Sequence, residues 1–230
     1  MTSSQNSHPS PLFAYPPQAA FGKVIPKTKI YKHAKAGKRV QQAFVDQVAR
    51  IEWQYKLAPE TIRLPARDGI EEIQVFRLEL KEGVGDKLAI EVLRCLDKAV
   101  PFPNIIEVCD RERVRVVAAY KRPSEAESGK WVLGDHYHSA WYPMTEERSP
   151  LPVVVDLAAL YGELLRRLLP YPPREAESLR THAERIERIN ALERELARLQ
   201  GRLGRERQFN RKVDVNREVG MLREELEGLK

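Results

Sequence analysis

The sequence is poor in cysteine and has no long apolar run. Cys95 and Cys109 are the two cysteines among 230 residues, and neither belongs to a CxxC pair. Because each lies in an apolar stretch, we expect two buried free thiols and a reducing compartment, not a disulfide or a cysteine-ligated metal. No apolar run approaches the roughly 18 residues of a membrane span, and the N-terminus lacks the basic and apolar regions of a signal peptide. These absences favour a cytoplasmic protein without membrane contact.

The short motifs of several enzyme classes are also missing. The sequence contains no P-loop, dinucleotide-binding glycine pattern, G-x-S-x-G elbow or HExxH. His136 and His138 form an H-x-H pair, but zinc needs further ligands, and no other histidine lies nearby in the sequence. We therefore expect an ordinary pair of strand residues and no metal site.

Acidic residues are scarce in one N-terminal segment. Residues 22–58 hold nine Lys or Arg against two acids, whereas the whole chain has a net charge of +6. Such a segment can contact phosphates, and the alternative is a solvated loop that aids solubility. The candidate nucleic-acid-binding residues are Lys23, Lys27, Lys29, Lys32, Lys35, Lys38 and Arg39.

The patterning divides the chain into three parts. Residues 1–21 are rich in Ser and Pro without charged side chains, which predicts a disordered tail. Residues 22–173 alternate helical and strand patterns and predict an α+β domain. Residues 174–230, rich in Arg, Glu and Leu, predict a charged helical hairpin or coiled coil.

Within the α+β domain, the apolar periodicity predicts helices and strands in a definite order. From Lys38, Val40, Phe44, Val48, Ile51 and Tyr55 recur every three or four residues, which predicts a helix that ends before Pro59. Residues 61–65 and 72–81 are expected to be strands joined by a turn at Arg67-Asp68-Gly69. Further along we expect a helix over 86–98 with Asp86 as its N-cap, and then a hairpin turning at 110–112. A strand over 131–143 and a helix over 151–169 follow, with Val155 facing inward. This order predicts an antiparallel sheet of about four or five strands with helices packed on it.

The C-terminal part carries two apolar seams that do not share one register. Either the helix turns back between them as an antiparallel hairpin, or it runs on with a rotated stripe. An apolar seam without a covering layer is marginal in water, so these residues are expected to bind a partner, unless the hairpin is self-contained. The candidate partner-binding residues are Ile189, Leu192, Leu196, Leu199, Leu203, Val215, Val219, Leu222 and Leu226.

One constellation could support catalysis. Glu79 and Lys81 are two residues apart on a predicted strand, so both project from one face, and Asp68 precedes them. This pattern resembles the core of PD-(D/E)xK nucleases, in which carboxylates hold Mg²⁺ and a Lys polarises the attacking water. Turn chemistry explains Asp68 and a solvated strand face explains the E-x-K pair equally well.

Five phrases of the sequence carry a family resemblance: IEWQYKLAPETIRLPA, EIQVFRLEL, VLRCLDKAVPFPNIIEV, VAAYKRPSE and ERQFNRKVDVNREV. In this order they resemble a bacterial family of unknown function, DUF4391, from about Lys23 to Lys230. The resemblance implies a cytoplasmic bacterial protein encoded beside a helicase and a DNA methyltransferase, in clusters that look like restriction or phage-defence systems. It supplies no catalytic residues.

These observations lead to one hypothesis and two alternatives. The hypothesis is a non-catalytic accessory subunit of a DNA-targeting assembly, without a cofactor, which docks a helicase or DNA methyltransferase and contacts DNA backbone. The first alternative is a Mg²⁺-dependent nuclease, and the second is a homo-oligomeric structural protein.

Overall fold

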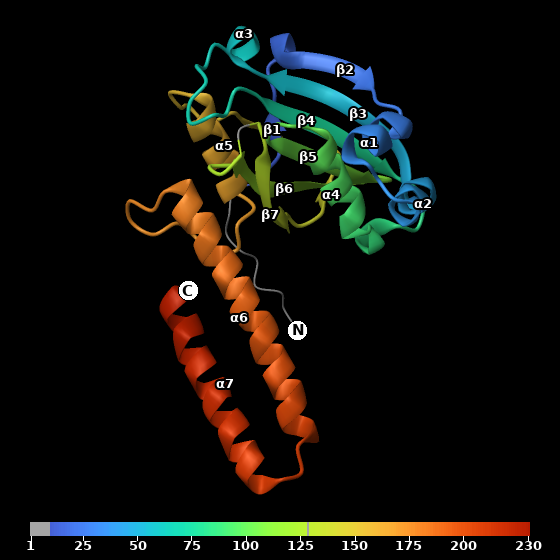
Figure 1. Ribbon diagram of the computed structural model, residues 1–230. Helices are drawn as coiled ribbons and strands as arrows, with labels where there is room; N and C mark the ends of the chain where they lie inside the picture. Colours follow the sequence, from blue (N-terminus) through green and yellow to red (C-terminus); the bar gives the residue numbers. More distant parts are fainter. Residues whose placement is uncertain (1–9, 128) are drawn as a thin grey trace. The chain divides into compact units, whose positions relative to one another are not determined.

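The computed structural model describes residues 10–127 and 129–230. The chain divides into two compact units, Met1–Leu168 and Leu169–Lys230. The first unit holds the β-sheet and the shorter helices, and the second holds two long helices (Figure 1). None of the helices in the described part of the chain is long and apolar enough to cross a membrane.

A mixed sheet of seven strands forms the centre of the first unit. Its order is β2-β3-β4-β5-β6-β7, and the short β8 also pairs with β6. A separate pair of two-residue strands, β1 and β9, runs parallel. The strands are β1 (Phe13–Ala14), β2 (Ala20–Val24), β3 (Val48–Leu57), β4 (Ile73–Leu80), β5 (Asn104–Asp110), β6 (Arg113–Pro123), β7 (Trp131–His138), β8 (Tyr142–Pro143) and β9 (Ser149–Pro150).

The mixed α+β class is confirmed, but the expected antiparallel sheet of four or five strands is wrong in two respects. Within the described residues the sheet has seven strands, and β4 and β5 pair in parallel. The parallel pair arises because α4 (Ile90–Ala99) lies between these strands in the sequence. A helix of this length carries the chain back to the edge where β4 began, so β5 runs in the same direction as β4.

The long helix expected from Lys38 to Pro59 is split in two. The helix α2 (Lys38–Gln47) ends where β3 begins, at Val48. A bulge between Val48 and Arg50 shifts the register of β3 against β4, so that Val48 and Ile51 both enter the core although they are three residues apart. The bulge thereby produced a helical spacing inside a strand, which is why the sequence pattern was misleading.

The strand expected at residues 61–65 is also wrong. This stretch contains the end of the one-turn helix α3 (Pro59–Ile62) and a loop. The turn predicted at Arg67-Asp68-Gly69 is present, because Arg67 bridges Ile70 across Asp68 (φ 53°) and Gly69 (φ 74°). Positive φ angles at both central residues are typical of a type I′ turn.

Two helix starts differ from the expected positions. Residues Gly85–Lys87 form a 3₁₀ turn, and α4 begins only at Ile90, where the Gln47 side chain accepts the Ala89 N–H at 2.8 Å. The helix α5 (Leu157–Arg166) begins after Asp156, whose carboxylate caps the Ala159 N–H at 2.8 Å. Val155 therefore precedes the helix and is 74% exposed instead of facing inward.

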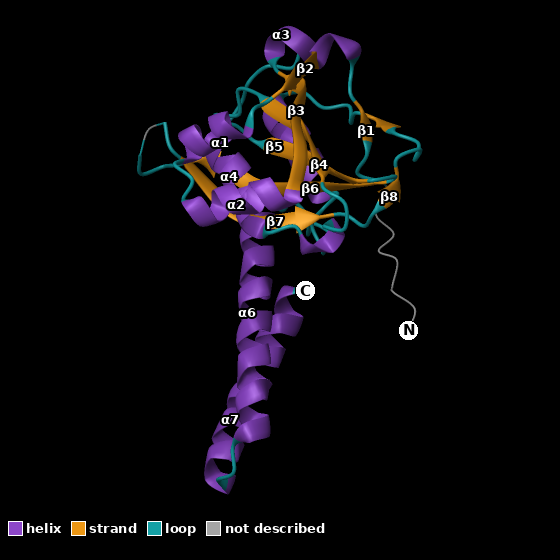
Figure 2. Cartoon of the chain, turned by 90° about the vertical axis from the view of Figure 1, so that its right-hand side faces the viewer, coloured by secondary structure: helices purple, strands orange, loops and turns teal. Residues whose placement is uncertain are grey.

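Three helices cover one face of the sheet. α1 (Lys27–Ala34), α2 and α4 lie together on this face (Figures 1 and 2), and α4 packs against the other two. The shared core contains Phe44, Leu96, Phe76, Leu78 and Ile106 among other buried side chains. Alternation along β4 and β5 points Arg77, Glu79, Glu107 and Cys109 toward the opposite face.

The N-terminal segment is more ordered than its composition predicts. The expected disordered tail covers residues 1–21, of which 1–9 lie outside the described residues. From Ser10 onward the chain is described, and Leu12, Phe13 and Tyr15 are buried. Arg148 donates a hydrogen bond to the Phe13 carbonyl at 3.0 Å, and the Tyr15 and Tyr55 rings lie 4.9 Å apart. Apolar side chains thus hold a segment that Ser and Pro content marked as disordered.

The second unit is an antiparallel helical hairpin. α6 (Leu179–Arg205) and α7 (Phe209–Leu229) lie side by side and are joined by residues 206–208 (Figures 1 and 2). Leu199, Val215 and Val219 form its buried centre, flanked by Leu196, Leu203 and Leu222. The two seams need no common register because they pack against each other across the hairpin.

Candidate nucleic-acid interface

The basic segment forms a charged surface on α1 and the start of α2. Ile30 faces the core, whereas Lys29, Lys32 and His33 occupy the outer face of α1 and are exposed. The exposed residues Lys35, Lys38 and Arg39 continue this surface through the connection into α2. We call Lys23, Lys29, Lys32, Lys35, Lys38 and Arg39 the basic surface.

None of these cations forms an ion pair in the part of the chain that the structure describes. No Asp or Glu occurs between residues 22 and 45. Among residues 10–127 and 129–230, no ion pair within 4.0 Å involves any member of the basic surface. The surface therefore keeps its positive potential and can attract a polyanion.

Lys27 serves a structural purpose instead. Its Nζ donates to the Phe44 carbonyl at 3.1 Å and to the Val48 carbonyl, at the C-terminal end of α2. Burial lowers the pKa of Lys27, and the nearby charge of Lys81 lowers it further. The ammonium lies against carbonyls at the C-terminal end of α2, where the helix dipole favours a cation. Lys27 is therefore unsuited to phosphate contact, although the sequence analysis listed it with its neighbours.

Lys23 lies beside two aromatic rings at the edge of the sheet. Its Nζ is 4.5 Å from the centre of the Phe21 ring, and the Phe21 and Trp53 rings are 4.0 Å apart. The quadrupole of the Phe21 ring attracts the cation, which remains exposed to solvent.

The three candidate catalytic residues do not meet. Asp68 lies in the exposed turn before β4, whereas Glu79 lies near the other end of that strand. Eight strand residues span about 25 Å at about 3.3 Å per residue. Lys81 follows the strand, its side chain is exposed, and its backbone N–H donates to the Gln47 carbonyl at 2.8 Å. The structure therefore separates Asp68 from Glu79 and Lys81.

Glu52 is the acid that the structure brings beside Glu79. It lies on β3 and not on a helix, and the register pairs Arg50 with Glu79 and Glu52 with Arg77. Both carboxylates lie beside guanidinium groups, with Arg50 3.1 Å from Glu52 and Arg77 4.0 Å from Glu79.

The neighbouring strand continues this charge-paired array. Glu107 on β5 is buried and receives two hydrogen bonds from Arg148, at 2.6 and 2.8 Å. Arg77 donates to the Cys109 sulfur at 3.3 Å. No cluster of three metal-ligating side chains occurs in the part of the chain that the structure describes. Because cations already lie against these carboxylates, they do not fit a Mg²⁺ site.

The H-x-H pair separates into one buried and one exposed histidine. His136 Nε2 lies 2.7 Å from Asp97, which also accepts a 2.8 Å hydrogen bond from Asn104. Lys121 Nζ donates to the Asp97 and Val100 carbonyls at the end of α4, and burial lowers the pKa of Lys121 to about 8. His138 is exposed. The network secures α4 to β6 and β7, and no local sequence pattern predicts it.

Cys95 and Cys109 are both free and buried, as expected. Burial raises the pKa of each thiol. A raised pKa keeps the thiols protonated at neutral pH and makes them poor nucleophiles and metal ligands.

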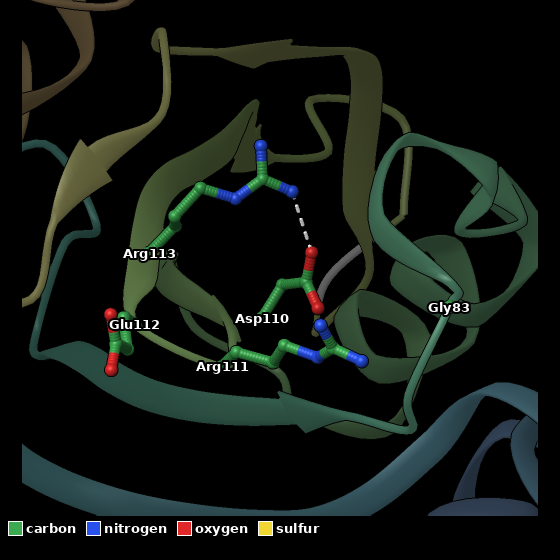
Figure 3. Close-up of a pocket in the computed structure, with 5 residues that line it drawn as sticks. All are labelled: Gly83, Asp110, Arg111, Glu112 and Arg113. Atoms are coloured by element: carbon green, nitrogen blue, oxygen red, sulfur yellow. Dashed lines mark hydrogen bonds and ion pairs between the residues drawn. The ribbon is translucent and has the colours of Figure 1, made fainter.

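A hollow of about 640 Å³ lies where β5 turns into β6. Figure 3 shows Arg113 directed at Asp110, 2.6 Å away, beside Arg111, Glu112 and Gly83. Arg111 is paired with Glu82 outside the drawn residues. Because carboxylates compensate both arginines, the hollow offers no net charge for an ionic ligand.

The predicted partner-binding residues fill the hairpin itself. Ile189, Leu192, Leu199, Val215, Val219 and Leu226 are each 3% exposed or less. Leu196, Leu203 and Leu222 are half-buried against them. The described seam residues are therefore buried wholly or in part within the hairpin, and a docking contact here would rely mainly on other side chains.

Among curated proteins and among solved structures, no match to this chain is found. Residues 13–226 match the family described as "Domain of unknown function (DUF4391)". The match covers nearly the whole chain, including both compact units, and agrees with the resemblance carried by its five phrases. This chain therefore belongs to the DUF4391 family.

Proposed function

We propose that this protein is a non-catalytic accessory subunit of a bacterial DNA-targeting assembly and that its basic surface contacts nucleic-acid backbone. The observation that carries the proposal is the set of exposed cations from β2 to α2 that form no ion pair with any described residue. Lysines on a helix surface contact phosphates without reading base sequence. The role is therefore to hold duplex DNA for a partner of the restriction or phage-defence kind.

Backbone contact has a measurable signature. Each phosphate contact releases condensed counterions, so the logarithm of affinity falls with the logarithm of salt concentration by about 0.9 per contact on duplex DNA. Binding should be tight at low salt, weak at high salt and insensitive to sequence.

Neutralising part of the basic surface tests the proposal. We expect Lys29→Gln with Lys32→Gln to reduce the salt slope by about 2, because two phosphate contacts are lost. Fluorescence anisotropy with a labelled duplex, measured across a salt series, gives this slope.

The control removes the same number of positive charges from outside the basic surface. Lys98→Gln with Lys130→Gln removes two exposed lysines outside the basic surface and should leave the slope unchanged. Equal slopes for both double variants would refute backbone contact through α1.

A helicase or DNA methyltransferase partner would dock on outer side chains of the hairpin. Val213 and Met221 on α7 are 43% and 58% exposed and lie outside the packed seams. Retained partner binding by a chain that ends at Pro173 would refute docking through the hairpin.

The nuclease alternative keeps one favourable observation. The β3–β4 register places Glu52 and Glu79 on one face of adjacent strands, with Lys81 just beyond. The guanidinium groups of Arg50 and Arg77 lie against these carboxylates, which weighs against metal chemistry there. The accessory role is therefore the better supported function.

A further inference from the structure

Positive charge in the hairpin gathers at its turn. Residues 198–217 hold seven Lys or Arg against two acids, whereas the rest of 174–230 holds seven against ten. The turn region thus carries a net charge of +5, and the remaining parts of the two helices carry −3. The hairpin as a whole is nearly neutral, but its turn is positive and the remaining parts of its helices are negative.

The cations at the two ends differ in their partners. Toward the other end, Arg185 pairs with Glu177 at 2.8 Å, Arg188 with Glu225 at 2.5 Å and Lys230 with Glu193 at 3.4 Å. In the described part of the chain, no ion pair involves six cations of the turn region. We call Arg202, Arg205, Arg207, Arg211, Lys212 and Arg217 the tip cations.

The acid at the turn itself is already engaged. The Glu206 carboxylate accepts the backbone N–H groups of Arg207 and Gln208, both at 2.9 Å. These hydrogen bonds lower the pKa of Glu206 and satisfy amides before α7. Glu206 thus stabilises the turn, and the charges of Arg211 and Arg202 lower its pKa further. Among the described residues it forms no ion pair with a tip cation, so these cations can still bind an external anion.

The tip also offers space beside the arginines. A hollow of about 500 Å³ is lined by Ala197, Arg198, Gly201, Arg202, Arg205 and Glu206. Gly201 has no side chain to fill it, and the nearest atom to a Cβ at this position would be Arg205 Nη2 at 3.9 Å. The hollow therefore leaves room for a phosphate group beside these arginines.

An exposed aromatic ring lies at the same end. Phe209 is the first residue of α7 and is 76% exposed. It does not belong to the buried cluster of Leu199, Val215 and Val219. An exposed ring among unpaired cations is the combination that single-stranded nucleic acid recognises, because unpaired bases stack on the ring while the cations hold the backbone.

We propose that the tip of the α6–α7 hairpin binds single-stranded nucleic acid, with the tip cations on phosphates and Phe209 stacked on a base. Duplex bases are already stacked on one another, so a single ring gains most from an unpaired base. Five of the six tip cations are arginines, which bind phosphate with two parallel hydrogen bonds. This site shares no residue with the basic surface on α1 and α2 and does not depend on it.

Removing charge at the tip tests the phosphate contacts. Arg202→Gln, Arg205→Gln and Arg211→Gln are combined in the full-length chain, and binding to labelled single-stranded DNA and RNA is followed by fluorescence anisotropy. We expect about a tenfold or greater loss of affinity and a salt slope smaller by about 2, at about 0.7 per single-strand phosphate.

The matched control removes the same charge from the other end of the hairpin. Arg180→Gln, Arg188→Gln and Arg223→Gln alter exposed arginines outside the turn region and should leave single-strand binding within twofold of the unaltered chain. Circular dichroism must show equal helix content in both triple variants. Equal affinity losses in the two triples would overturn the proposal.

Phe209 has its own test. Phe209→Ala should weaken single-strand binding by about 5- to 150-fold, the equivalent of the 1–3 kcal/mol that stacking contributes per base. Val132→Ala, which removes an exposed apolar side chain from β7, should have no effect. Phe209→Trp should retain binding and show fluorescence quenching when a base stacks on the indole.

Three further outcomes would refute the tip proposal and leave the proposal of duplex binding by the basic surface standing. In the first, Phe209→Ala and the tip triple bind single strands as the unaltered chain does. In the second, these variants lose binding to vesicles of anionic lipid but not to single-stranded nucleic acid. In the third, single-strand binding is lost only when Lys29 and Lys32 are altered. Comparison of the DNA and RNA arms shows which nucleic acid the tip prefers.

Discussion

Arg185 connects three segments of the hairpin unit through its guanidinium. Its guanidinium donates to both carboxylate oxygens of Glu177 at 2.8 and 2.9 Å, to the Leu229 carbonyl at 3.0 Å and to the Pro172 carbonyl at 2.9 Å. Both partners of the ion pair are at most 6% exposed in their side chains. One residue thus ties the start of α6 to the end of α7, and its hydrogen bonds lower the pKa of Glu177 to about 2.

This ion pair predicts a pH dependence of stability. A carboxyl whose pKa is lowered by folding stabilises the fold above its usual value near 4.5, and this contribution is lost as the pH falls toward 2. We expect Glu177→Gln to reduce the free energy of unfolding by about 2 to 3 kcal/mol at neutral pH, and by much less near pH 2. Urea titrations followed by circular dichroism across this range measure the difference.

An exposed ion pair serves as the control. Glu184 pairs with Arg180 at 2.9 Å, but both side chains are about half exposed. Glu184→Gln should change the free energy of unfolding by less than about 0.5 kcal/mol at either pH. Similar effects from both substitutions would show that burial of the Glu177–Arg185 pair contributes nothing.

At the scale of single elements, β3 shows that a bulged strand can have the apolar spacing that is typical of a helix. Val48 and Ile51 are spaced as on one face of a helix, but they lie on a bulged strand with β4 beside them. Spacing alone cannot distinguish these cases, because both arrangements bury the same residues. The strand pairing that decides between them involves residues about thirty positions away in the sequence.

The hairpin seam makes a prediction at the same scale. Leu199 is 3% exposed and packs against Val215 and Val219, so Leu199→Ala leaves a cavity and should destabilise the hairpin by about 2 to 5 kcal/mol. Hydrogen exchange of the α6 and α7 amides reports this loss directly. Met221→Ala, on the exposed side of α7, should stay within about 0.5 kcal/mol.

For the whole molecule, the internal pairing of the two seams removes one reason for self-association. The apolar residues that could have required a second copy are buried within the chain. We expect light scattering at two concentrations to give the mass of a single chain at both. A concentration-dependent mass would restore the homo-oligomeric alternative.

The choice between subunit and catalyst leads to a prediction for the whole chain. The chain alone should not nick supercoiled plasmid in the presence of Mg²⁺, because Asp68 lies apart from Glu79 and guanidinium groups already pair with Glu52 and Glu79. Nicking that disappears in Glu79→Ala would overturn this expectation and favour the nuclease.

The sequence by itself determined the features that depend on neighbouring residues. The basic segment, the free thiols, the turn at Asp68-Gly69 and the helical C-terminal part were predicted, because charge density, turn chemistry and apolar periodicity are local properties.

Only the tertiary structure decided what depends on distant partners. Strand pairing placed β4 parallel to β5 and separated Asp68 from Glu79, and packing turned Lys27 into a helix cap while burying both apolar seams. The free energy of these contacts comes from residues far apart in the chain, so no local pattern records it.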